Sequence, residues 1–562
     1  MAFQLSPGVN VSEVDLTTVV PSVATTVGGF AGKFNWGPVN EITIVSNEVQ
    51  LVEKFGKPDA NTHTSFFTAA NFLSYGNDLR VVRSVGSTAK NASGTGTTIL
   101  IENRTDYEQN RANGSSSETF AAKYPGALGN GLKISIADFS CFAGWTYEDE
   151  FDSAPASSDY VVNAGTSNDE IHIVVVDSTG SITGTANTIL EKFAFVSKAS
   201  DAKKDDGSTN YYKEILNNNS KYVWWIGHPA AGQTSWGLTA VQQAAADPTG
   251  YFDLVAEFTT TLSSGNDGIT TDSNLNASYD LFNNPDSVDV SLLMGGDLTG
   301  DTVADNLISI AESRKDCIVF LSPEKTDVVD NAGNEATDIG TYRDTITSSS
   351  FAVMDSGWKY QYDKYNDVYR WVPLNGDVAG LCARTDSERD PWFSPAGFNR
   401  GQIKNVVKLA WNPTKAERDT LYKVGVNPVV SFPGEGTVLY GDKTLLSRPS
   451  AFDRINVRRL FIVLEKAIAR AARSSLFEFN DEFTRAQFVN LIEPFLRDIK
   501  GRRGIYDYRV VADTTNNTAE VIDRNEFIGD IYIKPARSIN FIQLNFVATR
   551  TGVAFDEVVG KF

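Results

Sequence analysis

The sequence predicts a multidomain protein that combines α/β and α+β architecture, and three observations support this prediction. The chain has 562 residues, which is too long for one hydrophobic core. Strand-like and helix-like segments alternate over 24–87, which favours an α/β layer. Residues 288–321 then give a strand, an amphipathic helix and a buried strand, as in a βαβ unit.

A short strand precedes the compact part of the chain. Residues 7–14, PGVNVSEV, follow a Pro-Gly turn and alternate Val9 and Val11 with polar residues. A Thr-rich linker leads from there to the α/β pattern. We therefore expect 1–23 to form an N-terminal arm and 24–87 to form the first part of the core.

The middle of the chain is predicted to leave the core. Residues 88–118 are rich in Gly, Ser, Thr and Asn around one short strand, and indicate a short surface insertion. Strands such as LKISIAD and IHIVVVD, with helices expected near 187–197 and 238–245, predict a β-rich α+β insertion that protrudes from the core. We assign 119–344 to this protruding insertion.

The remainder of the chain is predicted to return to the core. Over 345–538 we expect the second part of the core, including helices at 453–476 and 483–500. A C-terminal strand arm then occupies 539–562. Its strand alternates apolar with polar residues, and the apolar positions are Ile542, Leu544 and Phe546.

The helix expected at 453–476, DRINVRRLFIVLEKAIARAARSSL, is basic although the formal net charge of the chain is −20. Its apolar residues recur with a period near 3.6 and predict a buried face. A second stripe of the same helix carries four cations: Arg459, Lys466, Arg470 and Arg473. We interpret this basic stripe as a surface free to meet an acidic partner. The alternative, which the segment alone favours, is a solvated face whose cations suit the helix dipole.

Residues that could support catalysis or hold a cofactor form no recognised pattern. His63, His172 and His228 have no neighbour at metal-ligand spacing, so we interpret them as structural histidines. The nearest match to a phosphate loop, GTVLYGDKT, inserts Asp442 where backbone amides should cradle phosphate. The three cysteines stand far apart in apolar surroundings and are expected to be reduced. The sequence therefore predicts no enzyme, no cofactor and no metal.

Charge and hydropathy argue against two further classes of partner. A net charge of −20 disfavours nucleic acid, which is itself a polyanion. The N-terminus lacks the pattern of a signal peptide, and no run of about 18 apolar residues could cross a bilayer. We expect a protein that neither binds nucleic acid nor inserts into a membrane, and that is assembled in a cytoplasm.

Specific motifs occur near both ends of the chain. They include LSPGVNVSEVDLTT, AGKFNWGPVNEI, NFLSYGNDLRVVR, KYQYDKYNDVYRWVPL, VAGLCARTD, PSAFDRINVRRLF, VIDRNEFIGDIYI and PARSINFIQLNFVATRTG. Together they resemble the tail sheath proteins of contractile-tailed phages of the T-even type, which are myoviruses. The resemblance is close over 1–87 and 345–562 and looser between them. After residue 87 those relatives carry a larger protruding domain than this chain does.

The resemblance implies a structural subunit of the virion. Such subunits polymerise as stacked hexameric rings, in a six-start helix, around the tail tube, and contract to drive the tube through the host envelope for genome ejection. The implied partners are further copies of the chain, the tail tube protein, and the baseplate and tail terminator proteins. In this family the terminal arms add strands to sheets of neighbouring subunits, and a basic helix faces an acidic tube. We carry the latter role onto the basic stripe as a hypothesis.

Three alternatives remain open at this point. The nearest is a sheath from a contractile injection system that is not a phage. An enzyme of the doubly wound α/β type would need a nucleotide or metal site that the sequence does not show. A nucleic-acid-binding module would explain the basic helix but not the acidic chain.

Overall fold

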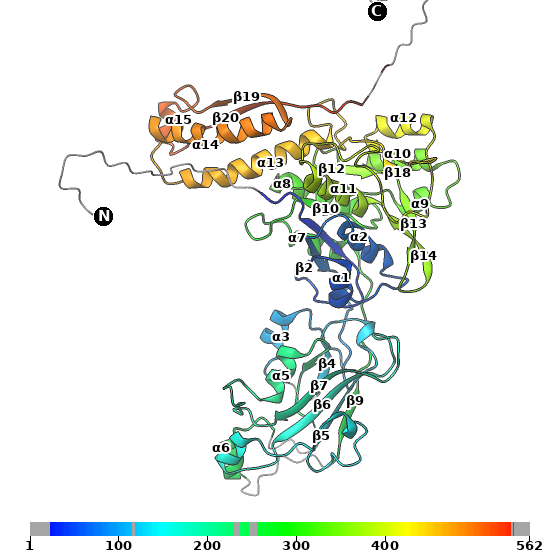
Figure 1. Ribbon diagram of the computed structural model, residues 1–562, viewed down its shortest axis with the longest axis vertical. Coiled ribbons are helices and arrows are strands. Elements are labelled where there is room, and N and C mark those ends of the chain that lie inside the picture. The colour runs from blue at the N-terminus through cyan, green and yellow to red at the C-terminus, as the bar shows by residue number, and fades with distance from the viewer. Residues whose placement is uncertain (1–22, 115–117, 230–235, 247–255, 541–542, 544–562) are drawn as a thin grey trace, which may run out of the picture.

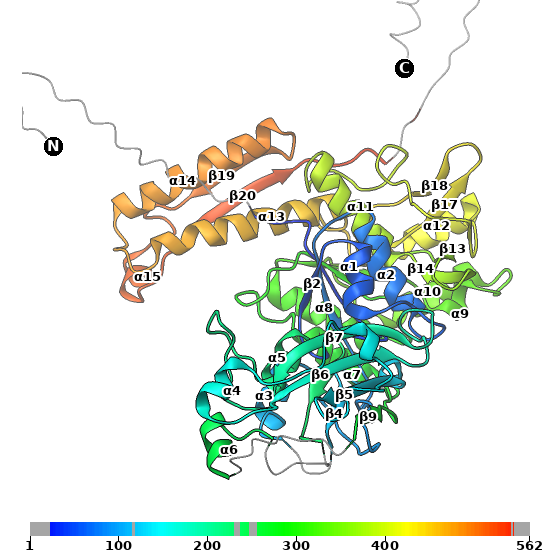
Figure 2. The same ribbon diagram turned by 60° about the horizontal axis from the view of Figure 1, so that its bottom comes forward.

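A computed structural model describes residues 23–114, 118–229, 236–246, 256–540 and 543 of the chain. Three parts follow one another along its long axis (Figure 1). A helical layer from the C-terminal part of the chain lies at one end, an α/β core lies in the middle, and a protruding domain lies at the other end. A view turned by 60° shows the same three parts (Figure 2).

A seven-stranded sheet forms the centre of the core, in the order β16-β12-β11-β10-β1-β3-β2. Neighbouring strands are parallel except β2 and β3, which are antiparallel. The strands are β1 (Gly28–Gly32), β2 (Thr43–Val45), β3 (Leu79–Arg83), β10 (Leu292–Met294), β11 (Ile318–Leu321), β12 (Ala352–Asp355) and β16 (Val426–Asn427). Because β1 pairs with β10, segments that precede and follow the protruding domain build one sheet, which confirms the predicted α/β core.

Helices cover both faces of this sheet, so its strands are apolar on both sides. Phe30 of β1 faces one layer of the core, whereas its neighbour Ala31 faces the other. The first layer holds α1 (Glu48–Phe55), α2 (His63–Leu73) and α11 (Asn375–Glu388). The second holds α7 (Asp272–Asp280), α8 (Thr302–Arg314), α9 (Lys325–Val328), α10 (Glu335–Thr345) and α12 (Lys415–Lys423).

Small antiparallel sheets extend the core. The aromatic segment 357–373 forms a hairpin that β15 extends, and a second hairpin lies beyond it. These strands are β13 (Trp358–Asp363), β14 (Val368–Pro373), β15 (Lys408–Leu409), β17 (Val429–Phe432) and β18 (Gly436–Leu439). The fully buried Lys359 of β13 forms an ion pair with the equally buried Asp377 of α11 at 2.9 Å. This pair joins the first hairpin to the helical layer beneath it.

The protruding domain is an antiparallel α+β unit. Its four-stranded sheet, β7-β6-β5-β9, contains β5 (Leu132–Asp138), β6 (Glu170–Asp177), β7 (Thr188–Ser197) and β9 (Phe258–Thr261). A second pair joins β4 (Phe120–Ala122) to β8 (Val223–Trp225). Its helices are α3 (Arg104–Asn110), α4 (Asp159–Ala164), α5 (Tyr212–Asn219) and α6 (Ala240–Ala246). The prediction of a helix near 187–197 is wrong, because that segment forms strand β7 and pairs with β6.

The expected boundaries of the insertions also need correction. Residues 119–344 were assigned to the protrusion, but β10 and β11 lie inside that range and belong to the central sheet. Residues 88–118 are not a separate surface insertion, because Ile99, Ile101 and Tyr107 pack against Trp224 in the protruding domain. Isolated bridges tie the same segment to residues near 263–266. The protruding domain therefore leaves the core after β3 and returns just before α7.

A narrow waist joins the protruding domain to the core, and two buried side chains hold it. The fully buried Arg83 of β3 donates hydrogen bonds to the carbonyls of Phe34, Gly37 and Pro125, and forms an ion pair with Asp267 at 2.8 Å. The Trp36 side chain extends from the core into the hydrophobic cluster of the protruding domain. These contacts fix the protruding domain against the core.

The C-terminal helical layer packs two long helices against a two-stranded sheet. It comprises α13 (Ile455–Ala472), α14 (Glu482–Gly501), β19 (Ile505–Val511), α15 (Ala519–Asp523) and β20 (Asp530–Pro535). Leu460 and Leu464 of α13 pack against Ile492 and Leu496 of α14, which confirms the buried face predicted for the basic helix. The arm residues expected to form strands lie outside the described residues; they are Val9, Val11, Ile542, Leu544 and Phe546.

Candidate functional site

The first member of the basic stripe on α13 is buried. Arg459 is 3% exposed, and its guanidinium forms an ion pair at 2.5 Å with Asp386, near the C-terminal end of α11. Burial raises the pKa of Asp386, and the nearby Arg459 counteracts that rise. The interpretation of Arg459 as a residue on a free surface is therefore wrong. Its charge holds α13 against the core.

The other three cations are progressively more exposed toward the C-terminal end of α13. The Lys466 ammonium is almost buried; it contacts Asp289 and donates hydrogen bonds to the Ala24 carbonyl and the Ser291 hydroxyl. Arg470 approaches the same Asp289 at 3.6 Å with about half its side chain exposed. Arg473 pairs with Asp286 at 2.8 Å, and both side chains are mostly in solvent. Of the predicted stripe, only Arg470 and Arg473 are placed to meet another molecule.

The sequence analysis missed the acidic partners of this stripe because they come from distant segments. Asp286 and Asp289 lie in the loop before β10, and Asp386 lies on α11. This loop connects α7 to β10, and the pairing of β10 with β1 sets its position. The one available signal was the pair of acidic residues in the segment DSVDV, which nothing in the sequence connects to α13.

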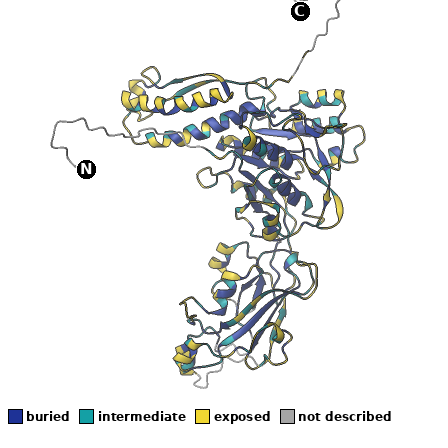
Figure 3. Cartoon of the chain, viewed as in Figure 1, coloured by how far each residue is buried: buried dark blue, intermediate teal, exposed yellow. Residues whose placement is uncertain are grey.

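The sheet of the C-terminal layer has two strands, and each has an outer edge without a partner among the described residues. One face of this β19-β20 sheet packs on α14 through Tyr508 and Ile533. The opposite face is open, with Tyr506 65% and Tyr532 61% exposed. Figure 3 shows that the outer side of α14 is also largely exposed. Two-stranded sheets are marginally stable alone, and open edges are sites for strand addition.

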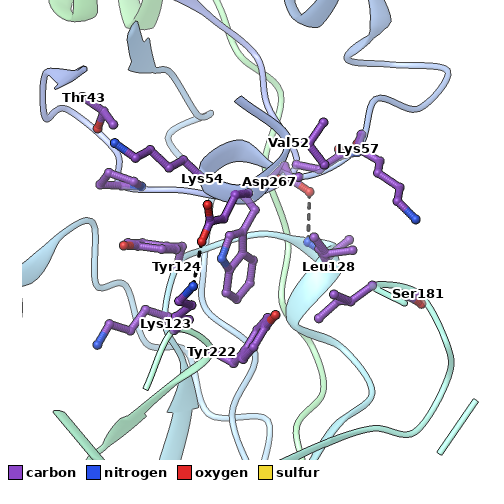
Figure 4. Close-up of a pocket in the computed structure, with 18 of the residues that line it drawn as sticks. Thr43, Val52, Lys54, Lys57, Lys123, Tyr124, Leu128, Ser181, Tyr222 and Asp267 are labelled. Atoms are coloured by element: carbon purple, nitrogen blue, oxygen red, sulfur yellow. Dashed lines mark hydrogen bonds and ion pairs between the residues drawn. The ribbon is translucent and has the colours of Figure 1, made fainter. Parts of the chain in front are cut away.

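A cleft lies at the waist between the core and the protruding domain (Figure 4). Its volume is about 1140 Å³, and Lys54, Tyr124, Tyr222 and Lys123 are among its lining residues. Burial lowers the pKa of Lys123 to about 7, and the Lys123 ammonium lies 3.3 Å from the centre of the Trp224 ring. An exposed ion pair between Glu53 and Lys221, at 2.7 Å, spans the two sides. Among the lining residues, the Ser220 hydroxyl donates a hydrogen bond to the Glu191 carboxylate at 2.6 Å.

The histidines and cysteines are dispersed through the fold. His172 stacks on Phe151 in the protruding domain, and burial lowers the pKa of His228 to about 4. Burial raises the pKa of Cys317 and Cys382 to about 12, so both are thiols at neutral pH. Within the described ranges, no group of three His, Cys, Asp or Glu side chains could hold a metal ion. No helix described in the structure is long and apolar enough to span a membrane.

Comparison with known proteins assigns the parts of this fold to one family. A model for the phage tail sheath protein central domain matches 290–445, and one for the tail sheath C-terminal domain matches 447–549. A third, for the N-terminal region of tail sheath protein Gp18 domain III, matches 25–83. The tail sheath protein of Enterobacteria phage T4 is 36% identical, with 99% of each chain covered. This chain belongs to the phage tail sheath protein family.

Further relatives agree with this assignment. The tail sheath protein of Vibrio phage KVP40 is also 36% identical, over 99% of this sheath protein and 100% of the relative. The alignment with the T4 protein runs over 681 positions, more than this sheath protein contains, so the relative carries additional residues. The family models also fit the corrected boundary, because the central-domain match begins just before β10.

Two solved structures have the same fold at low sequence identity. The sheath tail protein from Desulfitobacterium hafniense has a TM-score of 0.54 and 12% identity, over 94% of this sheath protein and 100% of that chain. The sheath tail protein from Listeria innocua has a TM-score of 0.52 and 12% identity, over 92% of this sheath protein and 96% of that chain. The family models and the relatives at 36% identity show that the chain is a structural subunit of a contractile phage tail sheath and a component of the phage particle.

Proposed function

We propose that this subunit polymerises with copies of itself as stacked hexameric rings, in a six-start helix around a tail tube. Contraction of this sheath drives the tube through the host envelope for genome ejection. The partners are the tail tube, the baseplate and the tail terminator, and assembly takes place in the host cytoplasm. The relatives at 36% identity are phage proteins, which favours this function over a sheath from a non-phage injection system.

The observation that supports polymerisation is the β19-β20 sheet with its open edges. The chain has two terminal segments with strand-like alternation, one around Val9 and Val11 and one around Ile542 and Leu544. In the proposed lattice these segments add to the β19-β20 sheets of neighbouring copies. Each added main-chain hydrogen bond stabilises the contact between two subunits by roughly 0.5–1.5 kcal/mol. An arm that forms several such bonds therefore holds two subunits together. Because an arm would join each subunit to the next, subunits can move relative to one another while they stay joined.

The contact with the tube is proposed to use the exposed end of the basic stripe, Arg470 and Arg473. Basic residues outnumber acidic ones from 447 onward, although the whole chain is acidic. An acidic tube surface would therefore meet this part of the subunit with a favourable potential. Exposed ion pairs contribute only about 0–1 kcal/mol each and weaken with salt. Such contacts can hold the sheath before contraction and release the tube during it.

No catalytic step is part of this function. The free energy of contraction comes from a lattice that relaxes into a second arrangement with better contacts between subunits, so neither nucleotide nor metal is required.

A proline test separates arm exchange from other modes of assembly. The double substitution Val9→Pro and Val11→Pro removes strand-forming capacity from the N-terminal arm without shortening the chain. Thr17→Pro, in the Thr-rich linker, is the matched control. We expect the unmodified protein and the control to form hollow helical polymers in electron micrographs, and the double variant to remain a folded monomer. Polymers of normal length from the double variant would contradict arm exchange.

A second experiment tests the tube contact. Arg470→Gln combined with Arg473→Gln should weaken the coating of cognate tubes at low salt and leave polymerisation without tubes unchanged. Glu482→Gln, an exposed change at the start of α14, is the control. Equal coating by the double variant and the unmodified protein would exclude Arg470 and Arg473 as the tube-facing residues.

A further inference from the structure

The turn between α13 and α14, together with the first turn of α14, exposes large apolar side chains. Leu476 is 63% exposed, Phe479 84% and Phe483 76%, and Phe477 is fully exposed at 105%. We call these four residues the apolar tip. Single exposed apolar residues are common on protein surfaces, but four within eight positions form a patch that calls for an explanation.

The apolar tip is held in place by ordered contacts. Phe477 has a φ of 71°, a left-handed conformation that is unfavourable for a bulky residue. The Asn480 side chain donates a hydrogen bond to the Glu526 carbonyl at 2.8 Å. The Asp481 carboxylate caps α14 by accepting from the Thr484 amide, also at 2.8 Å. Neighbouring structure therefore fixes a turn whose own backbone is strained, and this turn directs its apolar side chains outward.

The exposed area of the apolar tip is large enough to supply much of an interface. With about 200 Å² for a fully exposed phenylalanine, the exposed fractions correspond to about 600 Å² in total. The largest apolar patch on a typical monomer is about 300–600 Å². A stable protein–protein interface takes about 800 Å² from each partner. The apolar tip alone thus reaches most of one side of a standard interface.

We propose that the apolar tip docks on a second copy of this chain in the assembled sheath, an inference that rests on the proposed function. The tube contact has to release during contraction, and weak charge pairs suit it. Burial of about 600 Å² of apolar surface suits a contact that persists, and interfaces between permanent partners are the more apolar ones. The position of the apolar tip in the fold also favours this partner. Val23, the first described residue, packs against Ala471 of α13 and Leu491 of α14 in the same helical layer. Val23 thus packs near the end of α13 from which the chain continues into the apolar tip.

The first test measures polymerisation without a tube. Phe477→Ser combined with Phe479→Ser should raise the critical concentration for polymerisation at least tenfold, because two large apolar groups then stay in water. The matched control is Val241→Ser, which removes a 67% exposed apolar side chain from α6 of the protruding domain and should leave the critical concentration unchanged. Circular dichroism checks that both variants fold. An unchanged critical concentration for the double variant would overturn the proposal.

The second test identifies the partner directly. Phe477 is replaced by the photo-crosslinking residue p-benzoylphenylalanine in the full chain, and polymers with and without tubes are irradiated and analysed by denaturing gel and mass spectrometry. We expect covalent dimers of this chain in both samples. Adducts to the tube protein alone, adducts within one chain to residues 1–22, or no adduct in well-formed polymers would each overturn the proposal. If the unmodified protein forms no polymer under any condition, the proposed function itself fails.

Discussion

Replacing Arg459 with methionine should destabilise the packing of α13 on the core by about 3–5 kcal/mol. The side chains of Arg459 and Asp386 are 4% and 3% exposed and their charged groups lie 2.5 Å apart, so the substitution leaves a buried carboxylate without its partner. Protonation of Asp386 relieves part of this cost. Burial already raises the pKa of Asp386, so the folded variant keeps a proton that the unfolded chain releases. The destabilisation should therefore grow as the pH rises above the unfolded value near 4.

A second substitution separates the effect of charge from that of packing. Arg459→Met with Asp386→Leu replaces the ion pair by two apolar side chains of similar size, which in other buried pairs is neutral or stabilising. We expect the double variant to recover most of the lost stability. The exposed pair of Arg473 with Asp286 is the control, and Arg473→Met should change stability by no more than about 1 kcal/mol.

Hydrogen exchange of the α13 amides is the suitable assay, because it reports local opening within a multidomain chain. At neutral pH, Arg459→Met should accelerate exchange in α13 by on the order of 10²–10⁴-fold, and the double variant should return close to the original rate. If Arg459→Met exchanged at the original rate, the pair would carry no net stability. If the double variant were as unstable as the single one, the loss would arise from packing, and the electrostatic argument would be refuted.

Two further predictions concern other buried groups. Burial raises the pKa of Asp355 to about 8, so its carboxyl keeps a proton in the folded protein that the unfolded chain loses near pH 4. Between pH 4 and pH 8, this residue alone should lower the free energy of unfolding by about 1.4 kcal/mol for each unit that the pH rises. Urea titrations should therefore show a flatter pH dependence for Asp355→Asn than for the unmodified protein. An equal slope in that variant would contradict this assignment. Trp36→Ala should lower the stability of the protruding domain by about 3–5 kcal/mol, because it empties a buried site in the hydrophobic cluster of that domain. Amide hydrogen exchange should become faster around 120–138 and stay unchanged in the central sheet. The control is Phe139→Ala, at a 58% exposed site, which should change exchange little.

The sequence predicted those features that depend on local periodicity. The apolar face of α13 and the strands of the α/β core could be read from the spacing of their residues. The composition of 88–118 misled the domain assignment, because Ile99, Ile101 and Tyr107 suffice to bury a segment that is otherwise Gly- and Ser-rich. The segment 187–197 shows a related ambiguity, because short apolar runs fit a strand or a helix, and pairing with β6 decides in favour of the strand.

Features that depend on long-range contacts could not be predicted. The pairing of β1 with β10 joins segments more than 200 positions apart, and it places the Asp289 loop beside α13. The sequence therefore locates the cations of the basic stripe but not the acidic side chains that contact them. At one end of the stripe, Arg459 forms a buried ion pair with Asp386. At the other end, Arg473 stays exposed to solvent.

The most direct test of arm exchange is a high-resolution cryo-electron microscopy reconstruction of the polymer that the purified protein forms on its cognate tube. We expect the β19-β20 sheet to gain strands from the terminal arms of neighbouring copies, in a lattice with six-fold symmetry about the tube. A polymer in which this sheet stays two-stranded, or in which the arms fold back on their own subunit, would contradict it.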